Sequence, residues 1–266
     1  MNAGVKRLGI MAALPQELGD LIESMHAGGE VRTETIGRRE YHVGIAHGVP
    51  CVVTLARVGK VAAAATASAL IHLFGVDAIV FTGVAGGVRP DVRVGDIVIG
   101  ETLMQHDLDA SPLFPRFEVP LLGMARFPGD ATLNAALADA CSAFLADEHA
   151  ALETRFGVHP PQLHRGLIVS GDRFVSSHDE VNALRAALPD ALAVEMEGAA
   201  LAQVCFEHGV RCAIVRTVSD TADADAHESF LEFLHALGGT YSSGILRRFL
   251  AAWASSGNDP PAFLNA

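Results

Sequence analysis

The segment from Leu192 to Gly198 constrains the fold of this chain most, because an apolar run leads directly into charged residues. The apolar part is typical of the end of a buried strand, and the small residues after Glu197 favour a closely packed helix. Glu195, Met196 and Glu197 would then lie at a strand-to-helix junction. In an open α/β sheet, ligands bind at this end of the strands. We therefore expect an α/β fold with a site at that edge.

A second apolar run ends in the same way. The residues Ala213 to Val215 lead into Arg216, and Ser219 and Asp220 follow shortly after. Because the carboxyl ends of neighbouring parallel strands share one edge of a sheet, both sets of polar side chains are expected there.

Two further predicted strands end near candidate side chains. A strand over 8–13 is followed by Pro15 at a helix start and by Glu17 in the first helical turn. Glu17 has an alternative role there, since a carboxylate near a helix N-terminus stabilises the helix dipole. A strand within 165–174 ends near Phe174, which is either exposed at the strand end or a core aromatic. Both residues remain candidates at this point.

The glycine-rich segment Thr82–Gly87 follows an apolar run over 78–81, and we predict a turn there. Glycines in such a turn let backbone N–H groups approach a ligand, or permit a positive φ angle. The spacing matches neither the dinucleotide fingerprint nor the P-loop. We therefore expect no nucleotide cofactor, and no other cofactor is indicated.

The remaining patterns predict elements around these strand ends. Gly37 and Arg38 mark a β-hairpin in a meander beside the first strand. The cluster 105–109 is predicted to be a polar turn, because no second His-rich segment completes a metal site. The loop 111–117 is apolar and broken by prolines, so a ligand or partner subunit must cover it. The other expected elements are strands over 30–35, 40–46, 51–56 and 92–99, helices over 59–73, 131–145 and 230–253, and a surface connection over 148–164.

Composition excludes several classes of protein. The chain has 266 residues, of which half are apolar, so we expect one domain over 1–266 with loose tails at 1–7 and 255–266. A net charge of -12 argues against a nucleic-acid partner. The four cysteines lack metal-type spacing, and no apolar run reaches the ~20 residues of a membrane span. We expect a soluble cytoplasmic protein without a metal or a membrane partner.

Taken together, the strand ends predict one rim that carries carboxylates, an arginine, an aromatic side chain and backbone donors. Hydrolysis at a sugar carbon suits this set. One carboxylate can activate water, another can bind ribose hydroxyls, and a third can help to protonate the leaving group.

Four motifs in this order resemble those of the 5′-methylthioadenosine/S-adenosylhomocysteine nucleosidases, which belong to the nucleoside phosphorylase superfamily. The motifs are Thr82-Gly-Val-Ala-Gly-Gly87, Arg165-Gly-Leu-Ile-Val-Ser-Gly-Asp172, Val194-Glu-Met-Glu197 and Val215-Arg-Thr-Val-Ser-Asp220. The resemblance extends from about Leu8 to Leu234. It implies a three-layer α/β sandwich around a mixed, twisted sheet, a small nucleoside substrate and a homodimer.

The resemblance also implies roles for individual residues. Glu17 would activate water, and Asp220 would donate a proton to adenine N7 while Ser219 steadies it. Glu197 would hold the ribose hydroxyls, and Arg216 would position water and Glu197.

The other implied contacts surround the base, the sugar and its 5′ substituent. They are Phe174 stacked on adenine, the backbone of Val175 at the edge of the base, Met196 beside the sugar with Glu195 next to it, Leu14, Val58 and Phe230 along the 5′ path, and Leu113 and Phe114 over the partner subunit's site. One departure concerns Val84, because the family commonly has Ser there, near the attacking water. Val84 therefore bears on water placement or substrate preference.

Three functions remain open from the sequence. A hydrolase uses water, whereas phosphorylase relatives use phosphate and carry an arginine where this chain has Phe81. Phe81 favours water, and Arg57 keeps the phosphorylase alternative open. A non-enzymatic nucleoside-binding protein is disfavoured by the intact carboxylates. Among substrates, 5′-methylthioadenosine, S-adenosylhomocysteine, 5′-deoxyadenosine and a futalosine-type nucleoside all fit.

Overall fold

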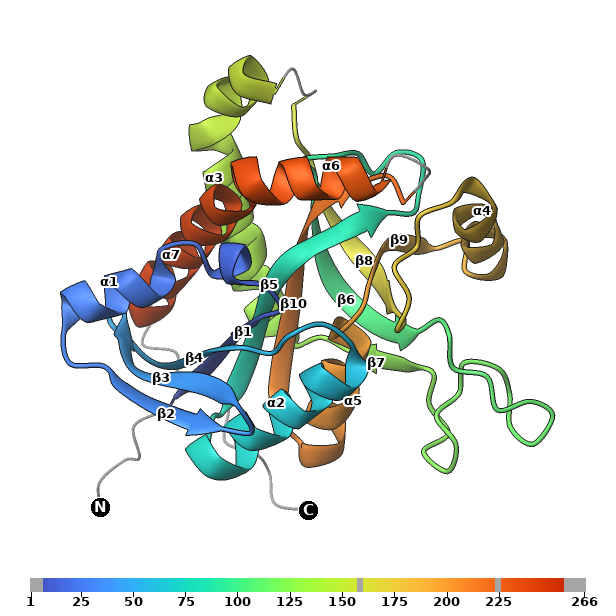
Figure 1. Ribbon diagram of the computed structural model, residues 1–266, viewed down its shortest axis with the longest axis horizontal. Coiled ribbons are helices and arrows are strands. Elements are labelled where there is room, and N and C mark those ends of the chain that lie inside the picture. Colours follow the sequence, from blue (N-terminus) through green and yellow to red (C-terminus); the bar gives the residue numbers. More distant parts are fainter. Residues whose placement is uncertain (1–6, 157–159, 223–225, 256–266) are drawn as a thin grey trace.

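The computed structural model describes residues 7–156, 160–222 and 226–255 (Figure 1). The predicted tails therefore lie almost wholly outside the described residues. The strands are β1 (Leu8–Ala12), β2 (Arg32–Ile36), β3 (Arg39–Ala46), β4 (Val49–Leu55), β5 (Ala78–Gly87), β6 (Ile97–Gln105), β7 (Arg126–Pro128), β8 (Leu163–Ser170), β9 (Ala191–Glu195) and β10 (Arg211–Asp220). The helices are η1 (Pro15–Leu18), α1 (Leu21–Gly28), α2 (Lys60–Phe74), α3 (Ala131–Phe156), α4 (His178–Ala187), α5 (Gly198–His208), α6 (Ala226–Phe233), the π-helical turn η2 (Leu234–Gly238) and α7 (Gly239–Ser255).

These strands form one mixed sheet in the order β10-β6-β8-β9-β5-β1-β4-β3-β2. Strand β1 is parallel to β4 and β5, whereas β2, β3 and β4 form the predicted antiparallel meander. Because β5 also pairs with β10, the strands β10, β6, β8, β9 and β5 form a closed circuit. The carboxyl ends of β1, β5, β9 and β10 thereby converge.

Helices cover both faces of the sheet, which makes the predicted three layers (Figure 1). One buried cluster joins the sheet to α1, α3 and α7, including Met25, Leu137 and Phe249. The other joins it to α2 and α5, where alanines such as Ala67 and Ala199 allow close approach. Of the helices in the described ranges, none is long and apolar enough to cross a membrane.

The glycine-rich segment Thr82–Gly87 is not a turn, contrary to the prediction. It continues strand β5 in extended conformation, and its glycines are needed for space rather than for φ. A Cβ atom on Gly83 would lie 2.8 Å from Glu17 Oε1, and one on Gly86 would lie 2.9 Å from Asp220 Oδ1. The strand can therefore pass directly against two carboxylates.

Three predicted boundaries were also wrong. Strand β6 begins at Ile97 instead of residue 92, because Gly95 turns with φ 91° and Asp96 accepts a hydrogen bond from the Arg93 backbone. The predicted connection over 148–164 is largely helical, since alanine-rich α3 continues to Phe156 before the prolines at 160 and 161. The predicted last helix begins earlier, at Ala226, and its helical residues run to Ser255 through the π-helical turn η2.

Candidate active site

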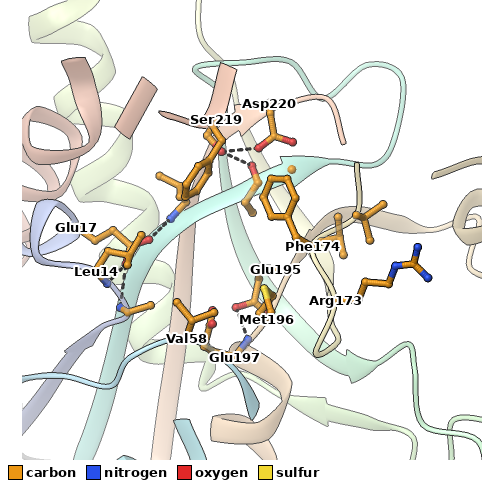
Figure 2. A pocket seen from close by; sticks show the side chains of 17 residues that line it. Leu14, Glu17, Val58, Arg173, Phe174, Glu195, Met196, Glu197, Ser219 and Asp220 are labelled. Carbon is orange, nitrogen blue, oxygen red and sulfur yellow. Dashed lines mark hydrogen bonds between the residues drawn. The ribbon is translucent and has the colours of Figure 1, made fainter. Parts of the chain in front are cut away.

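One pocket lies at the carboxyl ends of β1, β5, β9 and β10 (Figure 2). It is lined by Ala13, Leu14, Glu17, Val58, Val84, Ala85, Gly86, Arg173, Phe174, Val175, Val194, Glu195, Met196, Glu197, Ser219, Asp220 and Phe230. Every residue predicted for this subunit's own site lines the pocket except Arg216. Arg216 is buried behind Glu195, with which it forms an ion pair. Glu17, Glu197 and Asp220 lie on different sides of the pocket (Figure 2).

Glu17 is held by backbone donors from two segments. Its Oε2 accepts hydrogen bonds from the N–H groups of Ala13 and Leu14, each at 2.8 Å, and its Oε1 accepts one from Val84 at 3.0 Å. Burial raises the pKa of Glu17, and the nearby Arg216 charge and the backbone donors only partly oppose this. A buried carboxylate with a raised pKa accepts a proton more readily, as a base acting on water must.

Asp220 ends strand β10 and is held on both oxygens. Ser219 Oγ donates to Oδ2 at 2.8 Å, and the Ala222 N–H donates to Oδ1 at 2.9 Å. The side chain is almost fully buried, yet it lines the pocket. Ser219 and the Ala222 backbone therefore fix the orientation of the Asp220 carboxylate.

Glu197 precedes α5, and its Oε1 accepts a hydrogen bond from the Gly59 N–H at 2.8 Å. Burial, together with the charge of Glu195, raises the pKa of Glu197 to about 8. Gly59 is itself held in place, because the next N–H group, that of Lys60, donates to Asp172 Oδ1 at 2.8 Å. The start of α2 is thus tied to the loop after β8 beside Glu197.

Aromatic and apolar side chains complete the pocket. Phe174 is 39% exposed, so it is not the core aromatic that the sequence also allowed. Its ring lies 5.6 Å from that of Phe230 in an edge-to-face arrangement. Leu14 and Val58 lie near Glu17 and Glu197, away from Asp220 (Figure 2). The Phe174 ring therefore lies near Asp220, and the apolar side chains of Leu14 and Val58 lie near Glu17 and Glu197 (Figure 2).

A model of the phosphorylase superfamily matches residues 7–251. The chain belongs to this superfamily. The resemblance read from the four motifs is therefore confirmed at the level of the family.

Relatives within the phosphorylase superfamily include two kinds of nucleosidase. A 5′-methylthioadenosine/S-adenosylhomocysteine nucleosidase of Haemophilus influenzae (strain PittEE) is 36% identical over 229 residues, which are 86% of this chain and 92% of that protein. An aminodeoxyfutalosine nucleosidase of Helicobacter pylori (strain J99) is 32% identical over 230 residues, with the same shares. The solved structure of the Neisseria meningitidis 5′-methylthioadenosine/S-adenosylhomocysteine nucleosidase, in complex with methylthio-immucillin-A, has a TM-score of 0.82 and 34% identity. It covers 93% of this chain and 99% of that one.

In this phosphorylase-superfamily chain, the direct contacts of Arg216 differ from its predicted role of positioning water and Glu197. Its guanidinium is fully buried and pairs with Glu195 at 2.7 Å, whereas Glu197 is held by Gly59. The Arg216 carbon Cζ also lies 4.2 Å from the centre of the Phe81 ring. Arg216 therefore contacts Glu195 directly and acts on Glu17 and Glu197 through its charge.

Glu195 likewise differs from its predicted role in substrate binding. Its carboxylate accepts hydrogen bonds from Ser170 Oγ, from the N–H groups of Glu197 and Gly198, and from Arg216. These donors occupy both oxygens, so the carboxylate holds the strand-to-helix junction. The Glu195 side chain therefore forms part of the pocket lining next to Glu197.

Several contributing residues were not predicted. Ser170 ends β8 as Asp220 ends β10, so the same rule for polar residues at strand ends would have found it. Gly59 and Asp172 act through hydrogen bonds that join segments distant in sequence, and no local pattern indicates them. Ala13 and Arg173 line the pocket without an obvious sequence signal.

Proposed function

We propose that this protein hydrolyses the N-ribosidic bond of 5′-methylthioadenosine and S-adenosylhomocysteine, releasing adenine and the 5′-thio-substituted ribose. One observation carries the proposal: Glu17, Glu197 and Asp220, from three different strand ends, line one pocket beside an exposed aromatic ring. The nucleosidase relatives support the same reaction.

In this mechanism Glu17 takes a proton from the attacking water, whose oxygen bonds to the anomeric carbon of the ribose. The bond from that carbon to adenine N9 breaks, and Asp220 supplies a proton to N7 of the departing base. Glu197 accepts hydrogen bonds from the ribose hydroxyls. In its ionised form, which the raised pKa of about 8 makes more populated as pH rises, Glu197 stabilises the oxocarbenium-like transition state.

The remaining pocket residues orient the nucleoside. Phe174 stacks on adenine, the backbone of Val175 contacts the edge of the base, and Met196 packs beside the sugar. Leu14, Val58 and Phe230 line the path of the 5′ substituent. Val84 places its side chain in the pocket while its N–H donates to Glu17, so it shapes the space for water.

Phosphorolysis is the alternative reaction, and the buried residues disfavour it. Phosphate would need cationic donors beside the ribose, yet Arg216 is committed to Glu195 outside the pocket, and Arg173, which lines the pocket, pairs with Glu180. Phe81, where phosphorylase relatives carry an arginine, is itself buried beneath Arg216. A futalosine-type nucleoside remains an alternative substrate, supported by the Helicobacter pylori relative.

We expect purified protein to release free adenine and free 5′-methylthioribose from 5′-methylthioadenosine in phosphate-free buffer. Water is the nucleophile, so adding phosphate leaves the rate unchanged. Chromatography of the products distinguishes the two reactions, since phosphorolysis yields the ribose 1-phosphate instead. A requirement for phosphate would contradict the proposal, and parallel assays with 5′-deoxyadenosine and a futalosine-type nucleoside would rank the substrates.

We also propose a homodimer in which the loop around Leu113 and Phe114 covers the partner subunit's pocket. The β6–β7 connection extends away from the body of the chain (Figure 1), and Leu113 and Leu121 are 84% and 93% exposed. Such apolar exposure favours a partner surface. Sedimentation at assay concentration is expected to give a dimer, and Leu113→Asp is expected to weaken the dimer and raise KM together. A fully active monomer would disprove this arrangement.

The four cysteines are free and buried, which suits a reducing compartment, so we propose that the protein works in the cytoplasm. The 5′-methylthioribose product retains the sulfur of methionine. This supports a role in methionine salvage.

A further inference from the structure

A second cavity adjoins the active-site pocket. Its volume is about 440 Å³, against about 140 Å³ for the pocket itself. The two share Ala13, Leu14 and Val58, so they meet across an apolar boundary. The other residues that line the second cavity are Pro15, Arg38, Arg39, Glu40, His42, Leu55 and Arg57.

The cavity concentrates positive charge in a chain whose net charge is -12. Arg38, Arg39 and Arg57 carry permanent guanidinium charges, and Glu40 is the one carboxylate among the lining residues. The neighbouring His42 has its pKa lowered by burial, so it adds little charge at neutral pH. Of the ion pairs in the described part of the chain, none involves these three arginines.

The backbone holds two of the arginines in an uncommon conformation. Arg38 and Arg57 have φ angles of 60° and 70°, in the left-handed region that favours glycine. Arg57 Nη2 donates to the Arg38 carbonyl, and Arg39 Nε donates to the Ala56 carbonyl at 3.0 Å. For Arg38 the positive φ is the geometry of the two-residue hairpin turn that it forms with Gly37. The hydrogen bonds tie the β2–β3 turn to the segment that enters the pocket at Val58.

We infer that Arg38, Arg39 and Arg57, here called the arginine annex, bind a carboxylate at the far end of the substrate's 5′ substituent. The inference rests on the proposed function, which places the base at Asp220 and the ribose at Glu197. The 5′ carbon then faces Leu14 and Val58, on the side away from Asp220 (Figure 2), and the annex begins beyond them. The apolar boundary suits a thioether and its methylene chain, and the guanidinium groups suit the carboxylate.

Guanidinium groups also bind phosphate, but the position of the annex favours the substituent. A phosphate nucleophile must contact the ribose carbon between Glu17 and Glu197. Neither of these carboxylates lines the annex. An anion held by the arginines is therefore separated from the reacting carbon by Leu14 and Val58.

The test compares three nucleosides as substrates: 5′-methylthioadenosine, 5′-(3-carboxypropylthio)-5′-deoxyadenosine, and the carboxamide of the latter. The acid and the amide have nearly the same shape, so their kcat/KM ratio isolates the charge. At low ionic strength we expect the acid to be preferred about tenfold, which corresponds to about 1.4 kcal/mol. Added salt is expected to reduce this preference, because the arginines are partly exposed and salt screens them.

The double variant Arg38→Asn/Arg57→Asn tests the residues, since Asn tolerates left-handed φ angles. It is expected to remove most of the preference for the acid, since Arg39 remains, and to leave 5′-methylthioadenosine turnover within about twofold of wild type, because that substrate has no carboxylate for the annex to bind. Arg32→Asn is the matched control, because Arg32 lies on the same hairpin, pairs with Glu34 and does not line the annex. This control removes one positive charge from the same hairpin and is expected to keep the preference.

Several outcomes would overturn the inference. These are equal kcat/KM for acid and amide in the wild type, a preference that survives undiminished in the double variant, or a loss shared by all three nucleosides. Inorganic phosphate that speeds 5′-methylthioadenosine turnover in the wild type, but not in the double variant, would assign the annex to phosphate instead. If 5′-methylthioadenosine is turned over but the acid is not preferred, only this inference is wrong. If no nucleoside releases adenine, the proposed function is wrong as well.

Discussion

Replacing Asp220 with Asn is expected to lower adenine release by about 10²–10⁴-fold, the usual loss on removing a general acid. The amide keeps the shape of the side chain, and Ser219 and the Ala222 N–H remain beside it, but no transferable proton is left for N7. Contacts to Phe174 and Glu197 persist, so binding of a substrate analogue weakens far less than turnover. Single-turnover kinetics with calorimetric binding measures the two effects separately.

Glu17→Gln is the matched variant, and we expect a similar loss for a different reason. It removes the base that activates water, while Gln retains an oxygen that can accept from backbone N–H groups. A nitrophenyl riboside, whose leaving group departs without N7 protonation, separates the two roles. Asp220→Asn is expected to be partly rescued on this substrate, whereas Glu17→Gln is not. Equal rescue of both variants would show that these roles are wrongly divided.

Arg216→Met is expected to lower the free energy of unfolding by about 3–5 kcal/mol, because it leaves the Glu195 carboxylate buried without its counter-ion. Arg216 and Glu195 side chains are 1% and 3% exposed, so water cannot replace the lost partner. Urea unfolding monitored by circular dichroism measures the change. The control is Arg165→Met, which breaks an ion pair with Glu101 whose side chains are 43% and 49% exposed. It is expected to cost at most about 1 kcal/mol.

A double-mutant cycle measures the interaction between Arg216 and Glu195 separately from their contacts with other residues. Glu195→Gln is also expected to be destabilising. Gln has one acceptor oxygen instead of two, so some of the backbone N–H groups of Glu197 and Gly198 lose their hydrogen-bond acceptor. Combined with Arg216→Met, however, no uncompensated charge remains. We expect the double variant to lose less than the sum of the single losses, by about 0.5–3 kcal/mol. Additive losses would show that Arg216 acts independently of Glu195.

The sequence predicted the sheet and most of the pocket because burial leaves a local pattern. An apolar run that stops at a polar residue marks a strand end, as at Asp220 and Glu195. The register of a parallel sheet then brings such ends to one edge without further information. Helix lengths were predicted less well, because α3 continues past residue 145 through residues that carry no breaking signal before Gly157.

Roles that depend on contacts between distant segments were decided only by the tertiary structure. Glu195 and Glu197 stand two residues apart at one strand end, and local pattern does not show which faces the ligand. Packing separates them, since Arg216 and Ser170 reach Glu195 from other strands whereas Gly59 reaches Glu197 from the start of α2.

The same distinction explains the glycine-rich segment and the arginine annex. A glycine in a sequence permits either a turn or the close approach of another group. Only the structure shows that Gly83 and Gly86 are needed because Glu17 and Asp220 leave no room for a Cβ atom there. Arg38 and Arg57 lie 19 residues apart, on a hairpin turn and a strand-to-helix connection. The sequence alone determined that these residues are present and carry charge. They converge beside Val58 because β3 pairs with β4 and β4 pairs with β1. The register of these strands brings together side chains that are distant along the chain.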